Sequence, residues 1–396
     1  MTDAELELLI ATRRDLHQHP ELGFEEFRTA GIVADRLRAA GYQLKTGVAG
    51  TGVVGTLKGG GGPGGTLLLR ADMDALPIVE KTSHNFRSRH PGRMHACGHD
   101  AHVAIGIAVA ERLAKRADRL PGEIRYVFQP AEEGLGGASR MISEGVLEGV
   151  DAALGLHVWS GLPAGEVGVV DGPQMASFQD FTITVTGRGG HAAIPHETVD
   201  ALYVAAQIVV ALQSIVSRNI SPLDHAVVTV GSLHAGTASN IIAGSAVLGG
   251  TTRGFSSATD SLLRTRVTAV AEGVATALGA QARVEFAELV VPPTTNDPAL
   301  AALVRQVAIE VIGPEFVRSD PSVRTMAAED FAEFCTRVPG CFFFVGAAEE
   351  SIGAVHPHHS PFFDISEKAL PVGVEVLERA AVAWLTGSAA SASVSE

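Results

Sequence analysis

The stretch EIRYVFQPAEEGLGGASRMIS, residues 123–143, decides the fold class. Residues 123–128 predict a strand and residues 136–143 predict a helix. The acidic pair Glu132 and Glu133 lies on the loop between them. A strand followed closely by a helix is the repeating unit of an α/β sheet, in which helices cover both faces. The sequence around this pair therefore predicts an α/β domain.

The same alternation continues on both sides of this stretch. We expect helices over 5–17 and 101–113, and strands over 52–57, 66–70 and 152–157. The run GGGGPGG, residues 59–65, predicts a flexible hairpin connection between two of these strands. It lacks the Gly-Lys-Ser/Thr ending of a phosphate-binding loop, so no phosphate site is expected there.

A second pattern begins near Pro173. Strands are predicted over 178–186, 226–233, 245–252 and 282–289, with helices over 199–217 and 258–278. The resulting order, βαββαβ, is that of a small ferredoxin-like α+β domain. The segment VVPPTTND, 290–297, predicts a linker back to the first domain. We therefore expect residues 176–289 to be inserted into a domain formed by 1–175 and 290–396, with a disordered Ser- and Ala-rich tail from Gly387.

Composition excludes several classes of function. The 396-residue chain is 46% hydrophobic and carries a net charge of −14, so it offers no basic surface for nucleic acid or for an anionic membrane. Its N-terminus lacks the features of a secretory signal. The apolar stretch 201–212 is too short to span a bilayer and predicts a buried helix. Three cysteines make no disulfide framework, so a reducing, cytoplasmic setting is expected.

Acidic and imidazole side chains follow the predicted strands of the first domain. Asp72 and Asp74 come after the strand that ends at Arg70, the glutamate pair follows the next strand, and His157 closes the strand after that. Active sites of α/β sheets collect at the carboxyl ends of the strands. These side chains should therefore meet on one rim.

The stretch HACGHDAH, residues 95–102, supplies thiol and imidazole groups to the same region. Cys97 and His99 precede a predicted helix, whose N-terminus favours a thiolate. Thiolate and imidazole are good ligands for zinc, cobalt or nickel. The alternatives are a buried structural cysteine near a core histidine, and a covalent nucleophile with His99 as its base. The neighbouring carboxylates favour the metal site.

The pair Glu132 and Glu133 suggests hydrolysis. Consecutive side chains of an extended backbone point to opposite sides, so one carboxylate could bind metal while the other takes a proton from water. Further imidazoles lie in AVHPHHSPFFDI, where His359 is the favoured ligand and the roles of His356 and His358 stay open.

Three polar residues of the inserted domain form a candidate substrate clamp. Arg253 suits bidentate recognition of a carboxylate. His191 and Asn240 suit a carbonyl oxygen that becomes negative in the transition state. Each of them, taken alone, is more typical of a structural turn residue.

These stretches together resemble a known family of co-catalytic metallopeptidases. Its members include aminoacylases, hippurate hydrolase, plant auxin-conjugate hydrolases and acetyl-diaminopimelate deacetylase. The motifs that carry the likeness occur in the family's order along nearly the whole chain: HQHPELGFEE, RADMDALP, HACGHDAH, FQPAEEG, GLHVW, GHAA, SNII, AAEDFAEF and HHSPFFD. The Cys-Gly-His motif is similar to that of the amidohydrolase branch.

The resemblance implies a fold and a role for each residue of the site. The fold would be a mixed-sheet, zinc-peptidase-like catalytic domain with an inserted lid or dimerisation domain. Two divalent metal ions, of zinc, manganese, cobalt or nickel, would be bound by Cys97, His99, Glu133, His157 and His359. Glu132 would be the base, and Asp74 would orient a ligand. The lid would form a homodimer or higher homo-oligomer and deliver His191 and Asn240 to a site in the same or the partner subunit.

Two departures from the family's other patterns matter. Asp72 stands where the peptidase branches have a metal-binding histidine, which supports the cysteine-containing variant. Ala243 stands where the family often has proline, so the loop around Asn240 should be looser.

The expected activity is metal-dependent hydrolysis of the amide bond of N-acyl amino acids. The alternatives are a dipeptidase or aminopeptidase on the same fold, which must recognise a free α-amine, and a non-catalytic metal-binding protein, which has no need of Glu132. The sequence does not determine the acyl group, the amino acid or the metal.

Overall fold

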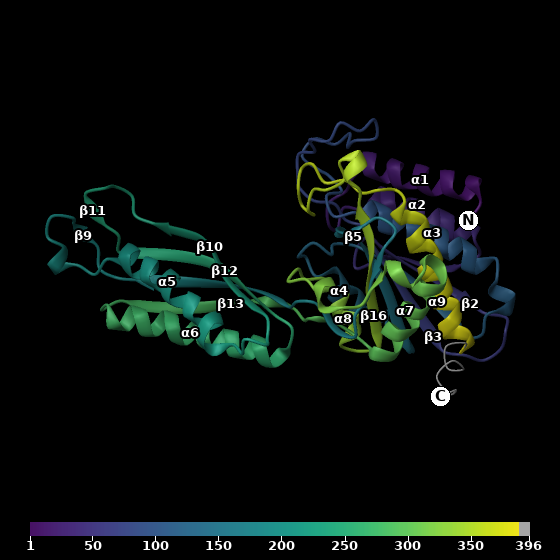
Figure 1. Cartoon of the computed structure of the whole chain (residues 1–396). Coiled ribbons are helices and arrows are strands. Elements are labelled where there is room, and N and C mark those ends of the chain that lie inside the picture. The colour runs from purple at the N-terminus through teal and green to yellow at the C-terminus, as the bar shows by residue number, and fades with distance from the viewer. Residues whose placement is uncertain (388–396) are drawn as a thin grey trace. The chain divides into compact units, whose positions relative to one another are not determined.

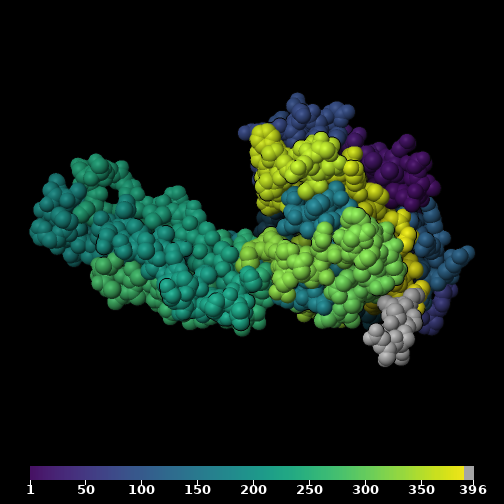
Figure 2. Space-filling view, viewed as in Figure 1, coloured from purple at the N-terminus to yellow at the C-terminus, as the bar shows by residue number. Residues whose placement is uncertain are grey.

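The computed structural model describes residues 1–387 (Figure 1). The predicted tail begins at Gly387, which ends the last described helix, and its remaining residues lie outside the described chain. Internal contacts divide the chain into two units. The core unit comprises Met1–Gln174, Thr295–Val323 and the chain from Asp330 onward. The inserted unit, drawn in teal and green in Figures 1 and 2, comprises Met175–Thr294 and Arg324–Glu329.

A mixed sheet forms the centre of the core unit. Within the described residues its strand order is β1-β2-β4-β3-β5-β16-β6-β15. Its parallel centre is made by β4 (Glu123–Gln129), β3 (Thr66–Asp72), β5 (Ala152–Pro163) and β16 (Gly340–Ala348). Its other strands are β1 (Gln43–Val48), β2 (Gly52–Lys58), β6 (Val167–Gly168) and β15 (Val317–Arg318). The predicted α/β mixed-sheet fold is thus confirmed.

Helices of the core unit bury the apolar faces of this sheet. Helix α3 (His99–Ala114) packs against α1 (Asp3–Gln18), α2 (Phe27–Ala39) and α9 (Ala369–Thr386), and α9 packs against α7 (Pro298–Ile312). Their side chains form one buried cluster with the central strands, in which Leu69, Leu154 and Phe343 are fully buried. Helix α4 (Gly137–Ser143), which follows Glu132 and Glu133 in the chain, packs against the short α8 (Ala332–Cys335).

The glycine-rich run 59–65 does not form the predicted hairpin. Strand β4 lies between β2 and β3, so the run connects two strands that are not neighbours. Its backbone is hydrogen-bonded, for example from Gly59 N–H to the Gly122 carbonyl oxygen at 2.9 Å. A Cβ atom at Gly59 would lie 1.9 Å from the Leu120 oxygen, so glycine is needed for this close approach. The prediction failed because adjacency in sequence did not determine strand order.

The strand register brings the predicted site residues to one rim. Asp72 pairs with Gln129 across β3 and β4, and Arg70 pairs with Gly155 across β3 and β5. His157 is consequently level with Asp72 and with the end of β4. The prediction that His157 closes its strand was wrong, because β5 continues to Pro163.

The inserted unit has the βαββαβ order. Its sheet runs β10-β12-β8-β13 and is antiparallel throughout. Its elements are β8 (Phe178–Thr186), α5 (Ala201–Asn219), β10 (Ala226–Ala235), β12 (Ser245–Gly254), α6 (Ser257–Ala277) and β13 (Gln281–Val291). Helix α5 has the length and hydropathy of a membrane span, but it packs on this sheet and buries Val204, Ile208 and Leu212.

Candidate metal centre

The glycine between Cys97 and His99 determines the backbone conformation of this segment. Gly98 caps helix α3 with a φ of 91°, a conformation that L-residues rarely adopt. A Cβ atom there would lie 2.4 Å from Val158 Cγ2 of strand β5. Glycine therefore lets the loop approach β5 closely and turn directly into the helix that begins at His99.

His99 presents one nitrogen to the site. Its Nδ1–H donates a 2.9 Å hydrogen bond to the Asp74 carbonyl oxygen. Its Nε2 is buried and, among the described residues, has no hydrogen-bond partner. A buried polar atom without a partner is costly, and a metal ion would relieve that cost.

Cys97 and His157 meet on the same rim. The Cys97 Sγ lies 3.4 Å from His157 Nε2, while His157 Nδ1–H donates to the Val158 carbonyl oxygen at 2.7 Å. Burial, together with neighbouring imidazoles, lowers the pKa of His157 well below its usual range. The ring is therefore neutral, with the Nε2 lone pair available to a metal.

Glu133 and His359 complete this group. Glu133 Oε1 is buried and lies 3.2 Å from His359 Nε2. The ligand atoms of Cys97, Glu133 and His359 lie within 4.8 Å of one another, as do those of His99, Glu132 and Glu133. The structure thus brings together all five predicted ligands and Glu132.

The glutamate pair does not have the predicted extended backbone. Ala131 has a φ of 55°, Gly134 a φ of 78°, and the Gly134 N–H donates to the Glu132 carbonyl oxygen at 2.6 Å. The pair therefore lies in a tight turn, and both carboxylates face His99 instead of pointing to opposite sides. The backbone therefore does not separate the two carboxylates, and the prediction that they point to opposite sides was wrong.

Asp74 holds this turn in place. Its Oδ1 accepts a 3.0 Å hydrogen bond from the Glu132 N–H, and its Oδ2 accepts one of 3.0 Å from the Glu133 N–H. The carbonyl oxygen of the same residue orients His99. Asp74 consequently fixes three of the groups that form the site.

His102 is not available as a ligand, although it lies near His99 and His157. Its Nδ1–H donates to Asp72 at 2.6 Å, and its Nε2 accepts the Val158 N–H at 2.9 Å. Asp72 also accepts a 2.6 Å hydrogen bond from Arg70. Burial opposes the ionisation of Asp72, but the charge of Arg70 and the hydrogen bond from His102 hold its pKa well below the usual range.

The electrostatics of the rim favour a bound cation. Burial opposes protonation of His99, but the surrounding carboxylates, Asp72 foremost, raise its pKa to about 10. Burial and the charges of Glu133 and Glu132 raise the pKa of Cys97 well above its usual range. The helix N-terminus alone therefore does not produce the predicted thiolate, and a positive charge must compensate before the sulfur ionises. This also disfavours a free nucleophilic cysteine.

The donor set and fold match a known family. Residues 68–383 match the description "Peptidase family M20/M25/M40". This chain belongs to that family. The predicted membership of a family of metallopeptidases and amidohydrolases is confirmed.

Several known proteins are similar to this M20/M25/M40 chain over most of its length. Thermostable carboxypeptidase 1 of Saccharolobus solfataricus is 39% identical, with 92% of each chain covered. The N-acetyl-L-cysteine deacetylase of Bacillus subtilis is 41% identical, covering 91% of this chain and 84% of its own. The IAA-amino acid hydrolase ILR1-like 4 of Arabidopsis thaliana is 39% identical, covering 95% and 86%. These relatives act on amide bonds, in agreement with the predicted enzyme class.

A solved structure of an M20 protein shows the same architecture. A dinuclear metal-binding peptidase from Bacillus subtilis superposes with a TM-score of 0.84 at 34% identity. The match covers 97% of this chain and 99% of that one. The fold of this M20 chain is therefore shared over nearly its whole length.

The inserted unit places the three clamp residues in two groups. His191 on β9 (Gly190–His191) pairs with Ile241 on β11 (Ile241–Ile242), and the Asn240 carbonyl accepts the Ala192 N–H at 3.1 Å. Arg253 lies near the far end of β12, roughly 26 Å along the strand from its start at Ser245. His191 and Asn240 therefore lie together, apart from Arg253, and the substrate clamp stays a prediction.

Arg253 has structural contacts of its own. Its guanidinium lies over the Phe178 ring at 4.9 Å, and Nη1 donates to the Met326 carbonyl at 3.0 Å. Burial lowers its pKa, although not enough to remove its charge at neutral pH. His191 is exposed, and its Nδ1 accepts the Ala193 N–H at 3.0 Å, so the neutral ring carries its hydrogen on Nε2.

Asp330 is a site residue to which the sequence reasoning gave no role. Its carboxylate accepts hydrogen bonds from Arg70 at 2.9 Å, from Gln129 at 2.8 Å and from the Ala138 N–H at 3.0 Å. Its own N–H donates to Glu132 Oε1 at 3.4 Å. The motif AAEDFAEF contained the signal, but only tertiary contacts show that Asp330 positions Glu132.

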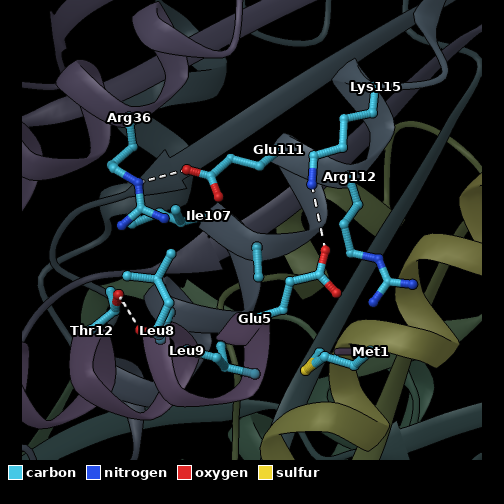
Figure 3. Close-up of a pocket in the computed structure, with 12 residues that line it drawn as sticks. Met1, Glu5, Leu8, Leu9, Thr12, Arg36, Ile107, Glu111, Arg112 and Lys115 are labelled. Atoms are coloured by element: carbon cyan, nitrogen blue, oxygen red, sulfur yellow. Dashed lines mark hydrogen bonds and ion pairs between the residues drawn. The ribbon is translucent and has the colours of Figure 1, made fainter. Parts of the chain in front are cut away.

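A cavity of about 110 Å³ lies away from this rim, between α1 and α3 (Figure 3). Its charged side chains are paired, Arg36 with Glu111 and Lys115 with Glu5. Among the described residues that line it, none was predicted as a ligand or catalytic group. It adds nothing to the metal centre.

Proposed function

We propose that this chain is a metal-dependent amidohydrolase that cleaves N-acyl amino acids into a carboxylic acid and a free amino acid. The observation that carries the proposal is the convergence of three groups on one rim. The buried His99 Nε2, which has no hydrogen-bond partner among the described residues, lies beside the carboxylates of Glu132 and Glu133.

The donor set fits two divalent metal ions. Cys97, Glu133 and His359 could hold one ion, and His99 with Glu133 a second, while His157 contacts the Cys97 sulfur. A thiolate, imidazoles and a carboxylate suit zinc, manganese, cobalt or nickel. When bound, the metal pair would polarise the scissile carbonyl and lower the pKa of the attacking water. The dinuclear site of the Bacillus subtilis neighbour supports this assignment.

Glu132 is the proposed general base. Its carboxylate faces the same space as His99 and Glu133, and the backbone N–H of Asp330 approaches its Oε1 at 3.4 Å. In hydrolysis it would accept a proton from the attacking water and return that proton to the leaving amide nitrogen. Asp74 would keep Glu132 in position by accepting a hydrogen bond from its backbone N–H.

The inserted unit would supply substrate recognition in a homodimer or higher homo-oligomer. Arg253 would bind the free carboxylate of the amino acid, while His191 Nε2–H and Asn240 would stabilise the carbonyl oxygen. His191 and Asn240 lie near the start of β12, whereas Arg253 lies near its end. We therefore propose that His191 and Asn240 serve the site of a partner subunit. The deacetylase and the IAA-amino acid hydrolase among the relatives support an N-acyl amino acid as substrate.

A peptidase acting on short peptides is the second candidate. The 39% identity to a thermostable carboxypeptidase favours it. Assays with N-acetyl-Met, hippurate and an unblocked dipeptide separate the two, because only a dipeptidase or aminopeptidase requires a free α-amine. Preference for the dipeptide would overturn the amidohydrolase proposal.

The decisive experiment combines metal replacement with two matched variants. Chelation should abolish activity, and zinc, manganese, cobalt or nickel should restore it. Glu132→Gln should lower kcat by at least about 100-fold with metal content unchanged, since it removes only the base. Glu133→Gln should lose metal. Most activity retained in Glu132→Gln, or activity unaffected by chelation, would contradict the mechanism.

A further inference from the structure

The ring of His358 is fixed by contacts with strand β5 and its neighbour. Its Nε2 accepts a 3.2 Å hydrogen bond from the Ser160 N–H. Its face stacks on Trp159 with 4.6 Å between centroids, and Trp159 stacks on Phe344 at 4.4 Å. Because Nε2 is an acceptor, the neutral ring carries its hydrogen on Nδ1.

That N–H faces Cys97, whose sulfur and carbonyl oxygen are both within its reach. His358 Nδ1 lies 3.8 Å from Cys97 Sγ, on the same sulfur that His157 Nε2 approaches at 3.4 Å. The position alone would allow His358 to act as a ligand with Cys97 and His157. The Ser160 contact argues otherwise, since it leaves an N–H at Nδ1 and no lone pair for a metal.

The two adjacent histidines of the loop point to different targets. His359 has a φ of 66°, which is rare for a residue other than glycine. Its N–H donates to the Ala96 carbonyl at 2.8 Å, and its ring approaches Glu133. Because of this turn, the His359 ring lies beside the Glu133 carboxylate and the His358 ring lies beside the Cys97 thiol.

We propose that His358 is a positioning residue that donates an N–H···S hydrogen bond to the Cys97 thiolate and thereby sets its orientation and donor strength. A hydrogen bond to a thiolate draws electron density from sulfur, so the ligand transfers less charge to a metal. A more electrophilic metal polarises a carbonyl more strongly. The inference rests on the proposed metal centre.

The test uses cobalt as the only added ligand. A thiolate bound to Co²⁺ gives a sulfur-to-metal charge-transfer band in the near ultraviolet, and this band reports on the sulfur independently of activity. His358→Gln keeps an acceptor near the Nε2 position but loses the donor to sulfur. His358→Asn restores an N–H near the Nδ1 position, and His358→Phe keeps the stack on Trp159 without any donor. His356→Phe, on the same exposed loop, is the control.

The expected result is an unchanged cobalt stoichiometry in all variants. In His358→Gln and His358→Phe the band should move to longer wavelength, because the sulfur becomes a stronger donor. Cobalt affinity should nevertheless fall by roughly tenfold, because the thiolate loses the contact that orients it. His358→Asn and the control should stay close to the unsubstituted protein. Circular dichroism and Tm establish that each variant is folded.

Three results would overturn the proposal. Loss of one cobalt equivalent in His358→Gln would make His358 a ligand. An unshifted band in both donor-free variants would mean that the N–H serves the Cys97 carbonyl, its other acceptor, or only packing. Absence of the thiolate band in the unsubstituted protein would overturn the Cys97 metal site itself, a failure that is distinct from the other two.

Discussion

The Oδ2 atom of Asp74 accepts a 3.0 Å hydrogen bond from the backbone N–H of Glu133. The other carboxylate oxygen accepts the N–H of Glu132, also at 3.0 Å. One side chain on the loop after β3 therefore sets the turn after β4 that carries Glu132 and Glu133. The carbonyl oxygen of Asp74 orients His99 on α3, so three elements converge on this residue.

Asp74→Asn should disorganise the metal centre. Asparagine has one acceptor oxygen, so its amide group would face one of the two N–H donors that the carboxylate now binds. We expect a roughly 10- to 100-fold loss of metal affinity and a parallel loss of activity. Titration against a competing chelator measures the affinity. Asp35→Asn on the exposed surface of α2 is the control, and equal affinities in the two variants would refute the role of Asp74.

Metal uptake at pH 7 should release protons. The pKa of His99 is raised to about 10 and that of Cys97 lies above its usual range, so both groups are protonated without metal. Ligation requires their deprotonated forms, so about two protons should leave per chain, and affinity should rise with pH. Calorimetry in buffers of different ionisation enthalpy measures the release. Cys97→Ser should reduce the number of released protons by about one. Proton release that does not depend on pH or on Cys97 would contradict these protonation states.

Glu26→Gln should change the pH dependence of stability. Burial raises the pKa of Glu26 to about 7, despite hydrogen bonds from Thr51 and from the Ala131 N–H. A carboxyl whose folded pKa exceeds the unfolded value of 4.5 contributes stability at low pH, and this contribution is lost as pH rises through 7. Urea titrations measure the free energy of unfolding at each pH. Between pH 5 and 8, where the two pKa values of Glu26 place the effect, the variant should lose less stability than the original protein. Exposed Glu7→Gln should leave the dependence unchanged; identical curves for all three proteins would disprove the assignment.

A shared active site predicts complementation between two inactive variants. If His191 serves the partner's site, His191→Ala and Glu132→Gln subunits co-expressed as mixed dimers should form one intact site per heterodimer. Random pairing should then restore about a quarter of full activity in a two-fold symmetric dimer. Activity after co-purification with two different tags measures this. No recovery in verified heterodimers would place His191 in its own subunit's site or outside catalysis.

Much of the fold followed from local patterns. The strand over 178–186 was predicted with the bounds that the structure shows, and the other elements of the inserted unit agree within a few residues. The meeting of Asp74, the glutamate pair and His157 on one rim also followed, because parallel strands align their carboxyl ends. Strand order did not follow, since β4 inserts between β2 and β3 through pairing that no local stretch encodes.

The sequence by itself determined which groups the site contains: a thiol, imidazoles and paired carboxylates, each placed at the end of a strand or the start of a helix. Tertiary structure alone decided how they are used. It puts Glu132 and Glu133 in a turn held by Asp74, and it occupies both nitrogens of His102. It also turns His358 toward sulfur while His359 faces Glu133. The reason is physical, because a ligand is defined by a free lone pair, and the hydrogen bonds that leave a lone pair free come from residues far apart in the chain.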